Sequence, residues 1–282
     1  VEKEYAAPKQ LEELLEKISE KQFDSLIVDD VNLLYLIPKS FNLRKHLEGV
    51  KLIVLSTVHN ETTAVADYLV PVLTSYETWG DHFPRPGIHT IQQPVMAPVT
   101  GFDNIAKEEF FHKVDAALGS PIYQGVSSFK EYLAHEWLTI YQKFGTQPSF
   151  EAFWVDVLET GGLFVDTKVE NVRLLGQIAS YLPKISEFKS ENDSFLLMPT
   201  KTTFLGDGEG ANKPWLQEVP DPMTQIVWDS WLEINPNTAK RLGIKNYSLV
   251  AVSNGSITLE VTAYYHFGVH ENVVALPMGK GI

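Results

Sequence analysis

Two short apolar runs, each preceded by a helical pattern, restrict the fold of this chain more than any other feature. The runs occupy residues 25–28 and 51–55. Apolar runs of this length are typical of parallel strands that are covered on both faces. Helical patterns precede them at residues 10–21 and 41–50, and a short helix is expected at 61–67, directly before a third candidate strand. This alternation predicts an α/β fold with a Rossmann-like, doubly wound parallel sheet and added helices.

The middle of the chain has mostly helical patterns. Residues 74–103 are the exception, because they are rich in Gly, Pro and aromatic residues and predict a long ordered loop with little regular structure. Helices are expected at residues 104–118, 127–144, 149–160 and 175–182. The second and third of these begin with Ser and carry Glu in the first turn, which is the usual signal of a helix N-terminus.

The pattern changes after the polar segment 186–194, which is the best candidate for a linker. Strands, a short helix that ends at Gly243 and a Gly-rich loop follow. The strands are expected at residues 195–198, 247–253, 256–265 and 272–276, the helix at 235–242 and the loop at 205–212. Asn254-Gly255 predicts a type I′ hairpin turn. We therefore expect two domains, an α/β domain at residues 1–190 and a small β-barrel-like domain at 191–282.

Composition excludes several classes of function. The formal net charge of −13 argues against a nucleic acid partner, because phosphate binding requires clustered Lys and Arg. No apolar run approaches the roughly 20 residues that a membrane-spanning helix needs, and the start lacks a signal-peptide pattern. The absence of Cys excludes disulfides, thiolate nucleophiles and Cys-ligated zinc or iron–sulfur centres within these residues. Because the chain starts at Val1 and stops at Ile282 directly after a strand, we expect it to be an interior piece of a longer protein.

Motifs of common catalytic centres are missing from the sequence. The eight His residues form no HExxH pair, and no G-x-S-x-G is present. His266 and His270 have the nearest spacing, but exposed loop residues are the ordinary interpretation. Glu61 and Asp67 would not share one helical face, so Asp67 is expected to be a cap or turn residue. Glu77 and Asp81 could orient a ligand, although an ordered turn is the preferred interpretation. We therefore predict no catalytic and no metal-binding residues.

One loop carries a candidate binding site. Gly206, Gly208 and Gly210 alternate along it, and Asn212 follows. Alternating glycines allow a backbone to approach an anion closely, and Asn can both donate and accept hydrogen bonds toward a bound ligand. The alternative is a long turn that fixes two domains against each other. These four residues are the predicted cofactor-binding residues, and a vestigial site with a structural role is the preferred interpretation.

Two passages resemble the molybdopterin oxidoreductase superfamily. Glu61-Thr-Thr-Ala-Val-Ala-Asp67, followed by Leu69-Val70-Pro71 and Glu77-Thr-Trp-Gly-Asp81, is similar to a passage that closes the third of four domains in that family. Ile234-Asn-Pro-Asn-Thr-Ala239 with Leu242-Gly243-Ile244 is similar to its C-terminal pterin-binding domain, a double-psi β-barrel. Asn246-Tyr247-Ser248 departs from the Gly-Asp that usually follows there, and Leu33 replaces the Pro of a Gly-x-Asn-Pro turn.

Two further passages narrow the resemblance. The stretch from Glu77 to Pro94, and Gly206–Asn212 with Pro214–Glu218, are similar to the large periplasmic subunit of alternative complex III. That resemblance implies a quinol-oxidising respiratory complex, associated with the membrane through partner subunits. It also implies that this half of the subunit has lost its molybdenum cofactor and acts as a scaffold.

The resemblance implies expectations for the cofactor, the iron–sulfur clusters and the partners of this chain. No cofactor is expected in these residues, although molybdopterin guanine dinucleotide is the cofactor of the family. Iron–sulfur clusters would lie elsewhere in the parent chain, whose other domains, with subunits of the complex, would be the partners. Two alternatives remain open, namely the cofactor-binding part of a true molybdopterin enzyme whose N-terminal domains are missing, and an unrelated α/β binding protein.

Overall fold

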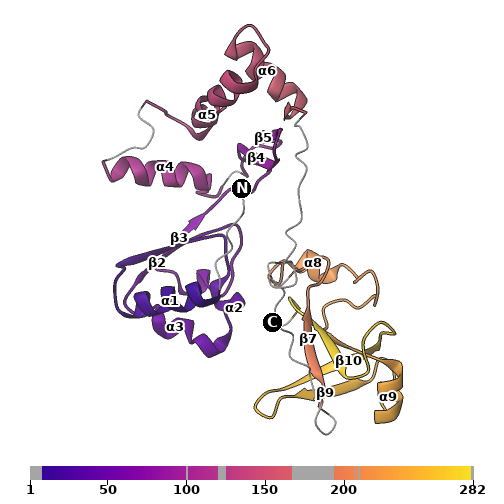
Figure 1. Cartoon of the computed structure of the whole chain (residues 1–282). Helices are drawn as coiled ribbons and strands as arrows, with labels where there is room; N and C mark the ends of the chain where they lie inside the picture. Colours follow the sequence, from indigo (N-terminus) through magenta and orange to yellow (C-terminus); the bar gives the residue numbers. More distant parts are fainter. Residues whose placement is uncertain are drawn as a thin grey trace, which may run out of the picture. The chain divides into compact units, whose positions relative to one another are not determined.

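The computed structural model describes residues 8–99, 101–119, 125–166, 194–206, 208 and 210–280 (Figure 1). The chain divides into two compact units. The first combines residues 1–31 with 44–174, and the second combines 32–43 with 175–282. The fold is mixed α/β, as predicted from the sequence. The predicted helix at 175–182 lies outside the described residues, as does the predicted linker at 186–194 except for Ser194.

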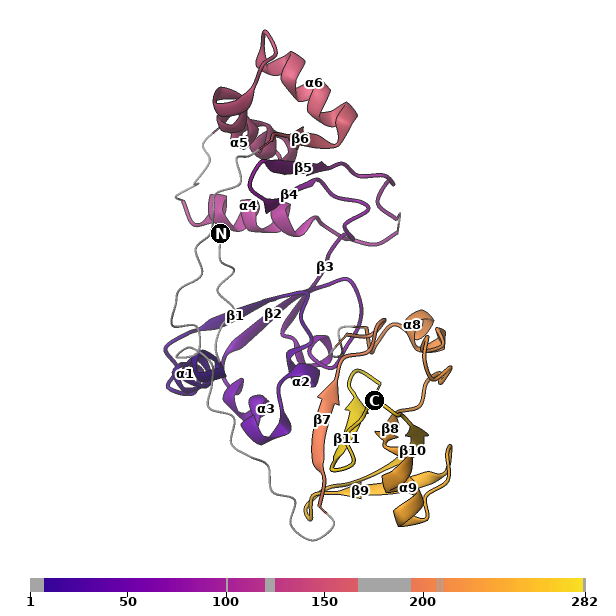
Figure 2. The same ribbon diagram turned by 45° about the vertical axis from the view of Figure 1, so that its right-hand side comes forward.

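A parallel three-stranded sheet opens the first unit, in the order β1-β2-β3. The strands are β1 (Ser25–Asp29), β2 (Lys51–Ser56) and β3 (Tyr68–Pro71). Helix α1 (Pro8–Ser19) lies against this sheet in both views and buries Leu15 and Ile18 (Figures 1 and 2). The parallel strands confirm the prediction from the apolar runs, because β2 is almost wholly buried.

The helices that connect the strands of the parallel sheet are shorter than the sequence predicts. The pattern at residues 41–50 gives only η1 (Lys39–Phe41) and α3 (Leu43–His46), and the pattern at 61–67 gives the 3₁₀ turn η2 (Thr63–Val65). The η2 turn is held by the side chain of Asn60, which accepts hydrogen bonds from the backbone N–H groups of Thr62 and Thr63. An Asn side chain that bonds locally in this way favours a turn over a longer helix.

A second, antiparallel sheet of the first unit corrects the prediction of a structureless loop at residues 74–103. It has the order β4-β5-β6, with β4 (Gly80–Arg85), β5 (Ile88–Gln92) and β6 (Gly162–Phe164). The β4 strand contains Pro and is largely exposed, so its residues lack an alternating apolar pattern. Its strand conformation comes from the ladder with β5, a pairing that sequence propensity does not reveal.

Three helices accompany this second sheet. They are α4 (Lys107–Ala117), α5 (Phe129–Phe144) and α6 (Phe150–Thr160), and all three were predicted. Ser128 and Ser149 cap α5 and α6 by accepting bonds from the backbone N–H groups of Glu131 and Ala152, so the predicted Ser caps are confirmed, one residue later than expected for α5. A shared core forms where α5 and α6 meet the sheet. It contains Ile91, Leu133, Trp137, Phe153 and Val157.

The second unit is built on a five-stranded sheet in the order β7-β11-β8-β10-β9. Parallel and antiparallel pairs alternate across it. The strands are β7 (Leu196–Thr200), β8 (Trp231–Ile234), β9 (Leu249–Ser253), β10 (Thr258–Tyr265) and β11 (Val273–Pro277). Strands β7 and β9 stay at the two edges, so the described strands form no closed barrel. The barrel expected from the sequence is therefore not confirmed by the described strands.

Three short α-helices accompany the sheet in the part of the second unit that the structure describes. They are α2 (Leu33–Leu36), α8 (Pro214–Glu218) and α9 (Pro236–Leu242). Helix α9 begins at an Asn235 cap and ends at Gly243 in the left-handed conformation, as predicted. Segment 32–43, which carries α2, follows β1 along the chain but belongs to the second unit. Among the described residues, no helix is long and apolar enough to cross a bilayer.

The hairpin between β9 and β10 differs from the predicted type I′ turn. Residues 254–257 form a four-residue loop, and among them only Gly255 has a positive φ. The Asn254 side chain accepts hydrogen bonds from the backbone N–H groups of Ser256 and Ile257. A type I′ turn needs positive φ at both central residues, so this local bonding of Asn254 selects the longer loop.

Candidate functional site

The Gly-rich loop of the second unit carries all four predicted binding residues, of which Gly206 and Asn212 are only partly buried. Gly208 and Gly210 are buried, as are Leu205 and Ala211, which are each 2% exposed. Gly206 and Gly208 have φ values of +58° and +123°. Residues with a Cβ adopt these values only with strain, so the glycines are required by the path of the backbone.

Backbone N–H groups of this loop are bonded within the loop itself. Gly206 donates to Thr202, Gly208 to Leu205 and Ala211 to Gly208, all at 2.9–3.1 Å from nitrogen to carbonyl oxygen. Leu205 donates to the hydroxyl of Thr202 at 3.1 Å. A phosphate-binding loop works by pointing free N–H groups at the anion. These four groups are already bonded and are therefore not available to a phosphate.

Side chains of the chain itself occupy the space that the glycines leave open. A Cβ on Gly208 would overlap the ring of Tyr35 from α2, with 3.0 Å to Cδ1 and 3.2 Å to Cζ. A Cβ on Gly210 would lie 2.8 Å from Cδ1 of Leu216. Gly206 differs, since nothing lies within 4 Å of its Cβ position. The loop therefore does not form an open cradle, and the residues present do not fit a pterin at Gly208 and Gly210.

One buried polar atom beside the loop lacks a partner. Gln217 is 1% exposed, and its side-chain nitrogen donates to the carbonyl of Ala211 at 3.1 Å. Its side-chain oxygen has no hydrogen-bond partner in the part of the chain that the structure describes. An unsatisfied buried acceptor costs free energy and is a place where a water or a ligand N–H could bind.

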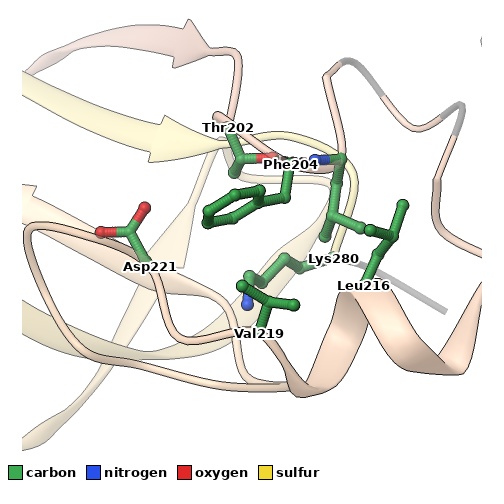
Figure 3. A pocket seen from close by; sticks show the side chains of 7 residues that line it. Thr202, Phe204, Leu216, Val219, Asp221 and Lys280 are labelled. Atoms are coloured by element: carbon green, nitrogen blue, oxygen red, sulfur yellow. Dashed lines mark hydrogen bonds between the residues drawn. The ribbon is translucent and has the colours of Figure 1, made fainter.

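A small pocket adjoins the loop and contains a buried lysine that the sequence analysis did not single out (Figure 3). Its volume is about 10 Å³, which is room for about one water molecule. Lys280 is 7% exposed, and its ammonium lies 5.6 Å from the centre of the Trp231 ring. Figure 3 shows the Lys280 side chain reaching toward Val219, with Asp221 at the other side of the pocket.

The charge of Lys280 is only partly compensated. Burial lowers the pKa of this amine, and the carboxylates of Asp221 and Asp229 act in the opposite direction. Among the described residues Lys280 forms no ion pair. The only sequence signal was a lone Lys between two glycines after a buried strand. The pocket is too small for a nucleotide or a pterin.

The carboxylates of the Glu77-Thr-Trp-Gly-Asp81 passage stabilise the first unit. Glu77 accepts hydrogen bonds from the backbone N–H and hydroxyl of Thr74 and from the N–H of Val99, and these bonds lower its pKa. Asp81 accepts a bond of 3.1 Å from the indole of Trp137, while burial raises its pKa. The two carboxylates thus hold a loop and a core helix, and their roles support an ordered turn rather than a ligand site.

The remaining candidates also have structural partners. Asp67 accepts a bond of 2.7 Å from the backbone N–H of Leu52 and donates its own N–H to the Leu52 carbonyl, which joins β2 to the turn before β3. Nδ1 of His266 lies 3.1 Å from the carboxylate of Glu233, and Nδ1 of His270 accepts from Asn272. In the described ranges no three His, Asp or Glu side chains come together as a metal site would require.

Comparison with known proteins shows similarity both in sequence and in structure. No protein-family model matches the chain. The chain is 22% identical over 264 residues to the menaquinone reductase molybdopterin-binding-like subunit of Nitratidesulfovibrio vulgaris (strain Hildenborough). It is similar in structure to acetylene hydratase from Pelobacter acetylenicus, with a TM-score of 0.57 and 17% identity, which is a likeness of fold.

Both matches cover nearly all of this chain but a minor part of the other protein. They extend over 91% and 94% of this chain, and the chain spans 36% of the menaquinone reductase subunit and 39% of the hydratase. Together they confirm the resemblance to the molybdopterin oxidoreductase superfamily that the sequence motifs indicate.

Proposed function

We propose that this chain is part of a molybdopterin-oxidoreductase-like subunit of a respiratory, quinol-oxidising complex, and that it acts there as a scaffold without a complete active site. The relative named as a subunit of a menaquinone reductase supports a role in quinone chemistry of a multisubunit assembly. The words "molybdopterin-binding-like" in its name are consistent with a protein that keeps the family's fold but does not bind the cofactor. Partners would be other domains of the parent chain and other subunits of the complex.

The packing of the Gly-rich loop is the observation that carries this proposal. Gly208 and Gly210, two of the three glycines predicted to approach a cofactor, instead pack against the chain's own Tyr35, Leu216 and Leu205. Several of the loop's N–H groups bond to the loop's own carbonyls. A site that has to open before a ligand can enter is unsuited to hold a resident cofactor. We therefore interpret Gly206, Gly208, Gly210 and Asn212 as a vestigial site with a structural role.

The same proposal includes the fold of each domain, the domain boundary and the cellular location. The parallel β1-β2-β3 sheet is consistent with a Rossmann-like domain, and the mixed sheet of the second unit with a double-psi-barrel relative. We propose domains at 1–190 and 191–282, separated by the polar segment 186–194. The resemblance to the large subunit of alternative complex III supports a periplasmic location with membrane association through partner subunits.

The second candidate is the cofactor-binding part of a true molybdopterin enzyme. The unpartnered side-chain oxygen of the buried Gln217, next to the loop, favours it, because a ligand N–H would satisfy this atom. In that case molybdopterin guanine dinucleotide would be the ligand, and the iron–sulfur clusters would lie elsewhere in the parent chain.

Metal and pterin content of the purified chain separates the two candidates. The chain is purified without an affinity tag, and molybdenum, iron and zinc are measured by elemental analysis. Pterin is released with acid, oxidised and measured by its fluorescence, with a molybdopterin enzyme treated identically as the positive control. The scaffold proposal expects far less than one metal atom or pterin per chain. Stoichiometric molybdenum or pterin would overturn it in favour of the second candidate.

A further inference from the structure

Three segments that are distant in the sequence meet at Gly208, inside the second unit. Tyr35 of α2 covers one side of the Gly208 residue. Gly279, which follows β11, approaches it as well, because a Cβ on Gly279 would lie 3.1 Å from the Gly208 nitrogen and 3.3 Å from its Cα. A side chain at either glycine would force these segments apart. The junction therefore depends on two glycines and one aromatic ring.

The Tyr35 ring makes the contact that a planar ligand would make. Gly208 has no Cβ, so a flat aromatic group can approach its backbone at van der Waals distance. Tyr35 is only partly buried, and Gly208 beneath it is buried. A ring tethered in the same chain also acts at a high effective concentration, which for short connections is on the order of millimolar. A free aromatic molecule would have to displace it.

We propose that Tyr35 is a built-in occupant of the Gly-rich loop, which closes the loop to planar aromatic ligands, and that removing the ring opens a site for such a ligand. This inference rests on the proposed scaffold function and deepens it, because it names the residue that closes the vestigial site. Segment 32–43, which carries Tyr35, belongs to the same compact unit as the loop. The contact is therefore internal to one unit.

The test uses the full chain and a large-to-small substitution. Tyr35→Ala removes a phenol ring, and removal of a packed side chain leaves a space that can bind a molecule of matching shape. The probes are phenol, which replaces the deleted ring, and pterin, a larger planar ring system. Binding is measured by the ligand-dependent rise of the melting temperature and, for pterin, by its fluorescence.

Two control variants and one alternative opened variant keep the result specific. Tyr35→Phe retains the ring and is expected to stay closed. Tyr76→Ala removes a tyrosine that is 66% exposed and controls for surface binding. Tyr35→Leu retains an apolar contact with Gly208 but not a planar ring, and it provides the same comparison if the alanine variant does not fold.

Tyr35→Ala or Tyr35→Leu is expected to bind phenol at least tenfold more tightly than the wild type, Tyr35→Phe and Tyr76→Ala. Pterin binding by the opened variants would further support a planar surface under the ring. If both opened variants bind the probes no better than the wild type, the inference is wrong while the scaffold function stands. If the wild type already binds pterin tightly, both the inference and the proposed function are wrong.

Discussion

The indole nitrogen of Trp137 donates a hydrogen bond of 3.1 Å to the carboxylate of Asp81, joining helix α5 to strand β4. Trp137 is fully buried at 0% exposure and lies at the centre of the first unit's aromatic core. Because burial raises the pKa of Asp81, and the bond from Trp137 lowers it, this one contact determines how well the folded chain tolerates a charge at this position.

Trp137→Phe should destabilise the first unit by about 2–4 kcal/mol, since it removes packed volume and the donor to Asp81. Without that donor the pKa of Asp81 rises further. A carboxyl whose folded pKa is raised loses stability as the pH rises from its ordinary value of 3.8 through the folded pKa. The destabilisation should therefore be larger at pH 7 than near pH 4, as measured by urea denaturation at both pH values.

The matched control is Trp154→Phe, the same substitution on the neighbouring helix α6. The Trp154 ring packs against Trp137 at 6.0 Å between ring centres, and its indole bonds to no described residue. Trp154→Phe should lower the free energy of unfolding by less than Trp137→Phe does, and this loss should not change with pH. An equal pH dependence in both variants would show that the Asp81 bond is not responsible.

Glu77 and Asp81 belong to one short passage, yet they should have opposite effects on the pH dependence of stability. Hydrogen bonds lower the pKa of Glu77, so its contribution is present above its ordinary value of 4.5 and is lost as the pH falls through the folded pKa. Glu77→Gln should lower the melting temperature at pH 7 and have little effect in acid. Asp81→Asn should raise it at pH 7, because the Asn oxygen still accepts from Trp137. Melting curves from pH 3 to 8 that show the same sign for both variants would contradict the assignment.

Lys280 should be a destabilising charge at neutral pH. Burial lowers its pKa, so the unfolded chain binds this proton more readily than the folded chain. Lys280→Met removes the charge and keeps the apolar volume, and it should raise the melting temperature at pH 7. The gain should shrink as the pH rises toward the ordinary pKa of 10.5, and above this pH the wild-type amine is largely neutral in both states. Loss of the contact with the Trp231 ring opposes this gain. A lower melting temperature at pH 7 would show that this contact dominates.

Features with a local cause were predictable from the sequence. Apolar runs predicted β1 and β2, although only β2 is mostly buried, as expected of a strand covered on both faces. Ser149 and Gly243 marked the start of α6 and the end of α9, since capping depends on one side chain or one backbone conformation. The Gly-rich loop was also identified from its own residues, although its partners were not.

Features with a distant cause were missed. The β4 strand contains Pro84 and exposed polar residues, and only its pairing with β5 and the bond from Trp137 to Asp81 make its position in the sheet clear. Nothing near Tyr35 in the sequence indicates that it packs on Gly208, because the contact depends on segment 32–43 joining the second unit. Lys280 was missed for the same reason, since its burial depends on Phe204, Leu216 and Trp231.

Alanine substitutions at the loop glycines should separate backbone strain from overlap with Tyr35. Gly206→Ala meets open space and should cost about 1–2 kcal/mol, because only its positive φ opposes a Cβ. Gly208→Ala carries strain from its own φ of +123° and also overlaps the Tyr35 ring, so it should cost roughly 1–3 kcal/mol more.

The φ values of Gly206 and Gly208 differ, so the two single substitutions do not separate backbone strain from overlap with the ring. A double-mutant cycle of Gly208→Ala with Tyr35→Ala can, because removing the ring relieves the overlap and leaves the strain unchanged. The double variant should be more stable than the sum of the single changes predicts, whereas Gly206→Ala with Tyr35→Ala should be additive. Denaturation midpoints of the six proteins give both coupling energies, and additivity at Gly208 would show that the ring does not restrict this position.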